Sequence, residues 1–162
     1  MTVVEARGGS GRLSSHGKRM VARVTYAKGA SFLGAAVLLR RQHGYEAVVL
    51  HVLCQGVEIV LKGILLFRNY DKYQPKLRQM GHNLEKLAMT AVREFRTRPL
   101  AAGMLAELNV LSGLYSKHLL RYGTFYDVLV DPASIPTAQV SKKILAVIRL
   151  ANRHIPEKKG AT

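Results

Sequence analysis

The sequence is poor in residues that build disulfides and metal centres, because Cys54 is its single cysteine. A lone cysteine cannot form an intramolecular disulfide or supply a cysteine-based zinc cluster. The spacings His-x3-His, Glu-x2-His and HExxH are absent as well, so we predict no metal site. No glycine-rich phosphate loop follows a strand-like segment. This absence excludes nucleotide binding of the Rossmann or Walker kind, and we expect no cofactor.

Acidic side chains are scarce: 10 Asp and Glu stand against 25 Lys and Arg, a net charge of +15. The excess is uneven, because residues 26–98 carry twelve basic and five acidic side chains, whereas residues 99–136 carry two and three. Such a balance favours polyanionic partners, namely RNA, DNA or an acidic protein. The alternative is simple solubility, since no basic motif interleaved with aromatic residues occurs.

Long apolar segments are also rare. The first twenty residues contain no apolar stretch of signal-peptide length. The run Ala47–Phe67 is long enough to tempt a membrane interpretation, but it includes the charged residues Glu58 and Lys62. Each charge at a bilayer centre costs about 2.5–3.5 kcal/mol. We therefore predict a cytoplasmic protein without membrane contact.

The apolar residues of the sequence recur mainly at helical spacing. The length of 162 residues suits one domain. We predict an all-α fold, an antiparallel bundle of four to five helices. The predicted helices are Val24–Gln42, Tyr45–Arg68, Asn83 to Arg98, Leu100–Tyr122 and Ala138–Arg153. Residues 1–22 are predicted to be a disordered basic arm, 23–156 the helical domain and 157–162 a disordered tail. Residues 69–80 are predicted to be a loop.

Four polar residues interrupt the second predicted helix at spacings of 4, 3 and 4, namely His51, Gln55, Glu58 and Lys62. These spacings place them on one side of a helix. An unpaired buried polar group costs about 1–3 kcal/mol, so the stripe must face solvent, a polar network or a symmetric partner. The rest of this helix is apolar around most of its circumference, and we therefore expect a homodimer.

The stripe points to a partly buried site that holds Glu58, Lys62 and His82. Glu58 and Lys62 form an i,i+4 pair in the favourable order. His82 precedes a helix N-terminus, where free backbone amides favour anions, so a phosphate could lie beside Lys62 and Arg78. The alternative is purely structural, with a salt bridge that holds the preceding loop and a histidine packed over the first turn.

These motifs, in this order, resemble the HEPN family, the helical domains named for higher eukaryotes and prokaryotes nucleotide-binding. The resemblance is carried by Glu58-x3-Lys62, by Gly81-His82-Asn83-Leu84 and by Arg121-Tyr122, and it covers roughly residues 26–154. It implies a helical bundle that is usually a homodimer. Many members are ribonucleases of toxin–antitoxin, abortive-infection or CRISPR systems, and others are non-catalytic partners of minimal nucleotidyltransferases.

Catalytic members of the family bring an Arg and a His from each protomer to a cleft at the dimer interface. Arg149 and His154 are the matching pair here. The match is poor, because five steps on a regular helix set the side chains about 140° apart. Leu150 also follows the Arg where the family carries Asn or Asp.

Basic residues Lys142, Arg149 and Arg153 fall on one side of the last predicted helix and could lie along a phosphate backbone, or could simply be a solvated face.

Our first hypothesis is a HEPN-like protein that lacks the standard ribonuclease pair and binds nucleic acid, a nucleotide or a nucleotidyltransferase partner. The alternatives are a metal-independent ribonuclease that uses Arg149 and His154 or a divergent pair, and a helical adaptor.

Overall fold

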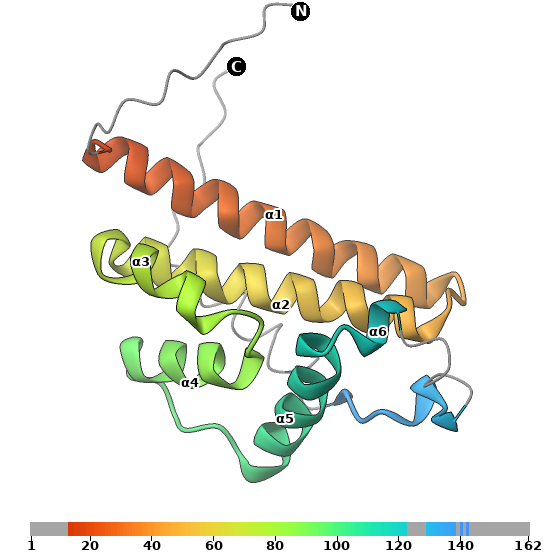
Figure 1. The fold of residues 1–162 in the computed structure, drawn as a ribbon. Coiled ribbons are helices and arrows are strands. Elements are labelled where there is room, and N and C mark those ends of the chain that lie inside the picture. Colours follow the sequence, from red (N-terminus) through yellow and green to blue (C-terminus); the bar gives the residue numbers. More distant parts are fainter. Residues whose placement is uncertain (1–12, 123–128, 139, 141, 143–162) are drawn as a thin grey trace, which may run out of the picture.

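The computed structural model describes residues 13–122, 129–138, 140 and 142 (Figure 1). Within these residues every regular element is helical and no strand occurs, which confirms the all-α prediction. The elements are α1 (Ser15–Arg41), α2 (Glu46–Arg68), α3 (Tyr70–Met80), α4 (Leu84–Glu94), α5 (Ala102–Ser116), α6 (Leu119–Tyr122) and the short 3-10 helix η1 (Pro132–Ser134).

Helices α1 and α2 lie side by side along most of their length (Figure 1). Glycines allow their backbones to approach closely. A Cβ atom added at Gly29 would lie 2.5 Å from the backbone nitrogen of Val60, and one added at Gly63 would lie 2.7 Å from that of Tyr26. No real Cβ tolerates such distances, so the pairing of these two helices depends on the glycines.

Helix α2 is the centre of the molecule. Helix α1 covers one side of it and α3 to α6 lie on the other (Figure 1), so that 14 of its 23 residues are buried. It is the one described helix that is long and apolar enough to cross a membrane, but 67% of its apolar window is buried inside the chain, as in the core helix of a soluble protein. The described residues cover much of α2, and the homodimer stays a prediction.

The first helix begins earlier than we predicted. Residues 15–22, assigned from sequence to a disordered arm, form the first turns of α1. Ser14 caps the helix, and its hydroxyl accepts a hydrogen bond from the Gly17 amide at 3.1 Å. Ala22 is fully buried, and Lys18 contacts Asp71 of α3 at 2.7 Å. Tertiary contacts therefore order a segment whose composition alone suggested disorder.

The predicted loop at residues 69–80 was wrong, because it contains α3. Its polar composition and Pro75 suggested a loop, yet the side chain of Asn69 caps the helix by accepting from the Lys72 amide. Tyr73 and Met80 are buried against the core on one face of α3. Burial of this face outweighs the cost of Pro75 inside the helix.

The later helices follow the prediction in part. Asn83 caps α4 as predicted, but α4 ends at Glu94 rather than at Arg98. The predicted helix Leu100–Tyr122 is divided into α5 and α6, because His118 has a φ of +57° between them. Most of the predicted helix Ala138–Arg153 lies outside the described residues.

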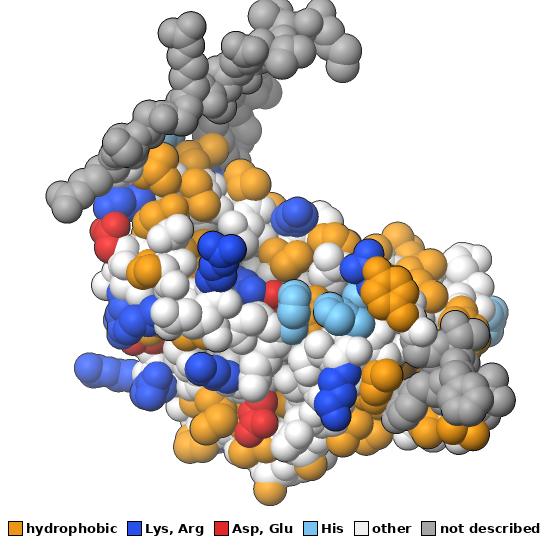
Figure 2. Space-filling view, viewed as in Figure 1, with side chains coloured by type: hydrophobic (Ala, Val, Ile, Leu, Met, Phe, Trp, Pro, Cys, Tyr) orange, Lys and Arg blue, Asp and Glu red, His pale blue; other side chains and the backbone are white. Residues whose placement is uncertain are grey.

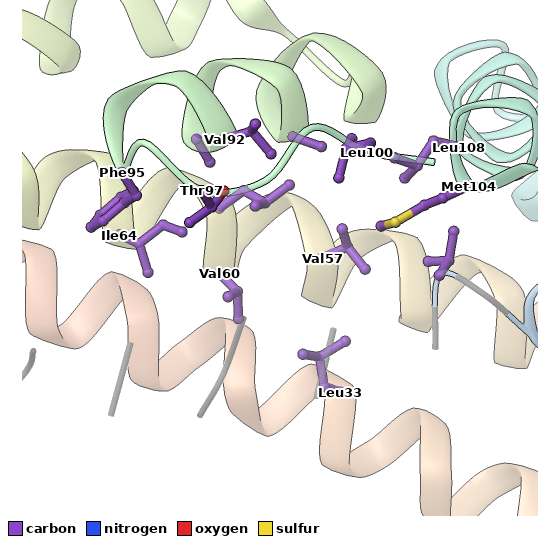
Figure 3. A pocket seen from close by; sticks show the side chains of 14 residues that line it. Leu33, Val57, Val60, Ile64, Val92, Phe95, Thr97, Leu100, Met104 and Leu108 are labelled. Atoms are coloured by element: carbon purple, nitrogen blue, oxygen red, sulfur yellow. The ribbon is translucent and has the colours of Figure 1, made fainter. Parts of the chain in front are cut away.

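An apolar cavity of about 80 Å³ lies among α1, α2, α4, α5 and the segment between α4 and α5 (Figure 3). Its lining is almost wholly aliphatic and aromatic, and Thr97 is the one residue with a polar side chain. Glu58, His82 and Tyr115 do not line it. This cavity therefore belongs to the packing of the core, and the candidate chemistry is elsewhere on α2.

Candidate functional site

The buried carboxylate of Glu58 lies at the centre of a cluster of polar side chains in the described core. The side chain of Glu58, only 7% exposed, accepts hydrogen bonds from three groups. Lys62 donates to Oε1 at 2.5 Å, His82 Nδ1 lies 2.9 Å from Oε2, and the hydroxyl of Tyr115 donates to Oε2 at 2.7 Å. The predicted contact of Glu58 with Lys62 and His82 is therefore present, and α5 adds a third partner.

These partners keep Glu58 charged. Burial raises the pKa of this carboxyl, but the hydrogen bonds from His82, Lys62 and Tyr115 outweigh burial and hold its pKa below the ordinary value. The same contact acts in the opposite sense on its neighbour, because burial and the Glu58 charge both raise the pKa of Tyr115. Near neutral pH the site therefore contains a carboxylate and a protonated phenol.

His82 is the part of this cluster that reaches solvent. It lies in the turn between α3 and α4, where Gly81 adopts a φ of +54°. Its side chain is 50% exposed, and its ring meets the Tyr115 ring edge-on at 5.3 Å between centroids. One ring nitrogen is committed to Glu58, so the imidazole is fixed in orientation while its outer edge remains accessible.

Further titratable side chains extend the cluster along α2 and into α6. The ring of His118 lies 5.9 Å from that of His82, and Arg121 stacks over the Tyr122 ring at 5.0 Å. His51 packs against Tyr115, and its buried Nδ1 has no hydrogen-bond partner among the residues that the structure describes. Burial, with smaller effects from Arg121 and His118, lowers the pKa of His51, so this ring is neutral near pH 7.

The first-turn amides of α4 offer less to an anion than we predicted. Asn83 accepts from the Lys86 amide at 2.8 Å, and the hydroxyl of Ser112 accepts from the Leu84 amide at 3.1 Å. Two of these donors are therefore already occupied. An anion at this place would be held mainly by side chains, with His82 nearest the helix start.

The remaining predicted residues do not join this cluster. Arg78 is exposed in the last turn of α3, and no contact with Glu58 is found for it among the described residues. Lys142 is helical and exposed. Arg149, Arg153 and His154 lie outside the described residues, so the predicted catalytic pair and basic stripe stay predictions.

Sequence reasoning missed three members of the site. Tyr115 lies within the predicted helix Leu100–Tyr122, and no contact of its hydroxyl with Glu58 was predicted. His118 was not predicted, and Arg121 was named only as part of the motif that carries the HEPN resemblance. The break between α5 and α6, which brings His118 beside His82 and Arg121 near His51 and Tyr115, leaves no strong local signal. Tyr115, His118 and Arg121 follow one another at spacings of 3, but this pattern does not reveal their partner on α2.

Basic side chains surround this region on the visible face. Figure 2 shows histidine side chains close together near the middle of the molecule, with Lys and Arg side chains on either side. Residues 68–98, which include α3 and α4, contain eight basic and three acidic residues. Asp71 contacts Lys18 and Glu94 contacts Lys72, so two of those acids are already paired. The face has an excess of positive charge.

The chemistry available here is proton exchange and anion binding. An imidazole oriented by a buried carboxylate can accept or donate a proton at its free nitrogen. Lys62 and Arg121 supply positive charge within the same region. Among the described residues, no group of three or more His, Cys, Asp or Glu side chains is arranged to hold a metal ion.

Comparison of the chain with known protein families, curated proteins and solved structures finds no match. The similarity to HEPN domains therefore depends on the motifs quoted above and stays a prediction.

Proposed function

We propose that the protein is a HEPN-like, cytoplasmic binding protein that holds a phosphate group of RNA or of a nucleotide at the Glu58–His82 cluster. The observation that carries this proposal is the half-exposed imidazole of His82, which a buried carboxylate fixes in place. The positive face around it supports a polyanionic ligand over a neutral one. A protonated or hydrogen-bonding imidazole at its outer edge would contact the phosphate oxygen.

Charge balance explains which residue would matter most. Lys62 donates to Glu58, so these two charges largely offset one another within the site. Arg121 stacks on Tyr122, and no acidic partner is found for it among the described contacts. We therefore assign Arg121 as the main cation for the phosphate and His82 as the group that orients it.

The test is binding of fluorescently labelled single-stranded RNA of mixed sequence, measured by anisotropy over a range of salt concentrations. Arg121→Ala should weaken binding and reduce the salt slope by about 0.7, the value for one lost phosphate contact on a single strand. His82→Ala should also weaken binding. Arg19→Ala, which removes an exposed charge on α1, is the matched control for net charge. Equal losses in all three variants would mean that the protein merely attracts polyanions.

One observation favours a second function. The rings of His82 and His118 lie 5.9 Å apart between centroids, so one imidazole could take the 2′-hydroxyl proton of RNA while the other protonates the leaving 5′-oxygen. This would be a metal-independent ribonuclease with a divergent pair in place of Arg149 and His154. Formation of a 2′,3′-cyclic phosphate in the presence of chelator, lost in both His82→Ala and His118→Ala, would identify it.

The HEPN resemblance also supports a partner role. A minimal nucleotidyltransferase encoded by a neighbouring gene, or a toxin–antitoxin arrangement, would supply the context that the resemblance implies. Co-purification of the two gene products would establish such a pair. A protein that binds neither RNA nor nucleotides and joins other proteins would instead be a helical adaptor.

A further inference from the structure

Helix α1 has a second periodic face that the described residues leave uncovered. Its inner face packs on α2, with buried residues at spacings of 4, 3, 4 and 3, namely Ala22, Tyr26, Gly29, Leu33 and Ala36. On the opposite side, six exposed residues repeat the same pattern at spacings of 4, 3, 4, 3 and 4. We call this set the outer seam: Met20, Val24, Ala27, Ser31, Gly34 and Leu38.

The ends of the outer seam are apolar and its middle is small. Val24 is 60% exposed and Leu38 is 61% exposed, which is unusual for large aliphatic side chains on one helix. Figure 2 shows hydrophobic side chains along part of α1. Between them lie Ala27, Ser31 and Gly34, so the middle of the seam carries only small side chains. Spacings of 3 and 4 are those of a seam that packs against another helix.

Gly34 has no role within the described chain. A Cβ atom added there would meet nothing within 4 Å, whereas one added at Gly29 on the inner face would collide with α2. Glycine is a poor residue for the interior of a helix, so its presence at an open position requires a reason. The inner face shows what a glycine in this pattern does on this helix, namely admit the backbone of a second helix.

The charge of α1 selects the kind of partner. The helix carries six Lys and Arg residues and no Asp or Glu. Lys18 and Arg40 are paired with Asp71 and Glu46. The cations nearer the outer seam are Arg19, Arg23, Lys28 and Arg41. A second copy of the same helix would bring a second set of these like charges to the interface, which opposes self-pairing. An anionic lipid surface would match the charge, but the small side chains in the middle of the seam would add little apolar area for membrane binding. A helix with an apolar stripe and acidic flanks satisfies both the charge and the shape.

We propose that the outer seam of α1 binds an amphipathic, acidic helix of a partner protein. The partner's apolar stripe would lie along the seam, its backbone would approach closest at Gly34, and its Asp and Glu residues would face the Lys and Arg residues of α1. This surface is independent of the phosphate site proposed above, because it uses neither Glu58 nor His82.

The experiment uses two synthetic helical peptides of about four heptads each, with Leu and Ala in the apolar stripe. One carries Glu at the flanking positions and the other carries Lys. Binding to the full chain is measured by calorimetry. The Glu peptide should bind at least about tenfold more tightly than the Lys peptide, and the difference should shrink as salt is raised.

Variants of the protein locate the contact. Val24→Asp and Leu38→Asp should each weaken binding of the Glu peptide about tenfold or more. Met89→Asp, at a residue of α4 that is 51% exposed, is the matched control and should leave binding unchanged. Gly34→Leu is the sharpest variant, because it adds apolar area but blocks close approach. It should weaken helix binding, whereas it would strengthen attachment to a lipid surface. Circular dichroism confirms that each variant is folded.

Several results would overturn the proposal. Equal binding of the two peptides, or binding of neither, would remove the argument from charge. A dimer in light scattering that Val24→Asp dissociates would assign the seam to a second copy. Sedimentation with phosphatidylserine vesicles that Gly34→Leu increases would assign it to a membrane surface.

Discussion

Removal of the Glu58 charge should be among the most damaging isosteric changes in the described core. The carboxylate holds Lys62, His82 and Tyr115 together, and it is 7% exposed. Glu58→Gln keeps the size of the side chain but presents an amide NH2 to at least one donor. Breaking a buried charge pair from one side typically costs about 3–5 kcal/mol, and we expect a loss of unfolding free energy in that range.

The partner change should be milder. Lys62→Met leaves Glu58 with two hydrogen bonds, from His82 and Tyr115, and Lys62 is 20% exposed. We expect a loss of about 1–2 kcal/mol, the range for a hydrogen bond to a charged group reduced by partial solvent screening. The double variant should lose clearly less than the sum, with a coupling of at least about 0.5 kcal/mol.

Urea unfolding followed by circular dichroism measures this cycle, because the chain contains no tryptophan. The pair Arg40–Glu46 is a matched control, since its side chains are 42% and 26% exposed. Arg40→Met and Glu46→Gln should each cost less than about 1 kcal/mol. If the Glu58 and Lys62 losses are equally small and additive, the cluster is an ordinary solvated ion pair and the reasoning about a built site fails.

Three further expectations follow from the packing and the titration of the core. Gly63→Ala should lower the free energy of unfolding by about 1–3 kcal/mol, because its Cβ would collide with the backbone of Tyr26. Gly34→Ala, at an open position, should instead raise the melting temperature. Equal effects of the two variants in thermal melts would contradict the contact between α1 and α2. The folded-state pKa of Glu58 is lower than its ordinary value of 4.5, so its contribution is complete above that pH and is lost as the pH falls through the lowered pKa. The free energy of unfolding, measured as a function of pH below 4.5, should therefore change less in Glu58→Gln than in the unchanged protein. The same pH dependence in both proteins would argue against a charged Glu58. A chain that begins at Arg23 lacks the first turns of α1 and should melt a few degrees lower, whereas an unchanged melting curve would show that those turns add nothing.

The sequence predicted the helical class and part of the site for a clear physical reason. Periodicity along α2 and the spacing of Glu58 to Lys62 are local properties, fixed by the geometry of a single helix. The cap at Asn83 is local as well, because its side chain reaches an amide three residues away. The proximity of His82 to this pair was predicted from the polar stripe, from the helix that His82 opens and from the HEPN resemblance, and the contact between His82 and Glu58 is present.

The errors arose where contacts across the chain decide the outcome. Pro75 disfavours a helix over residues 69–80, and burial of Tyr73 and Met80 outweighs its cost. The first turns of α1 have the composition of a disordered arm, yet Ala22 is buried against the rest of the chain. Both are cases in which tertiary packing outweighs local preference.

By itself, then, the sequence determined the helical class, the position of α2 and the α2 residues that form a polar stripe, because these depend on neighbours one or two turns away. Only the tertiary structure decided what that stripe meets. The break at His118 turns α6 back toward α2, and it brings His118 within 5.9 Å of His82. Tyr115 reaches Glu58 across 57 residues of sequence, a separation that no local pattern encodes.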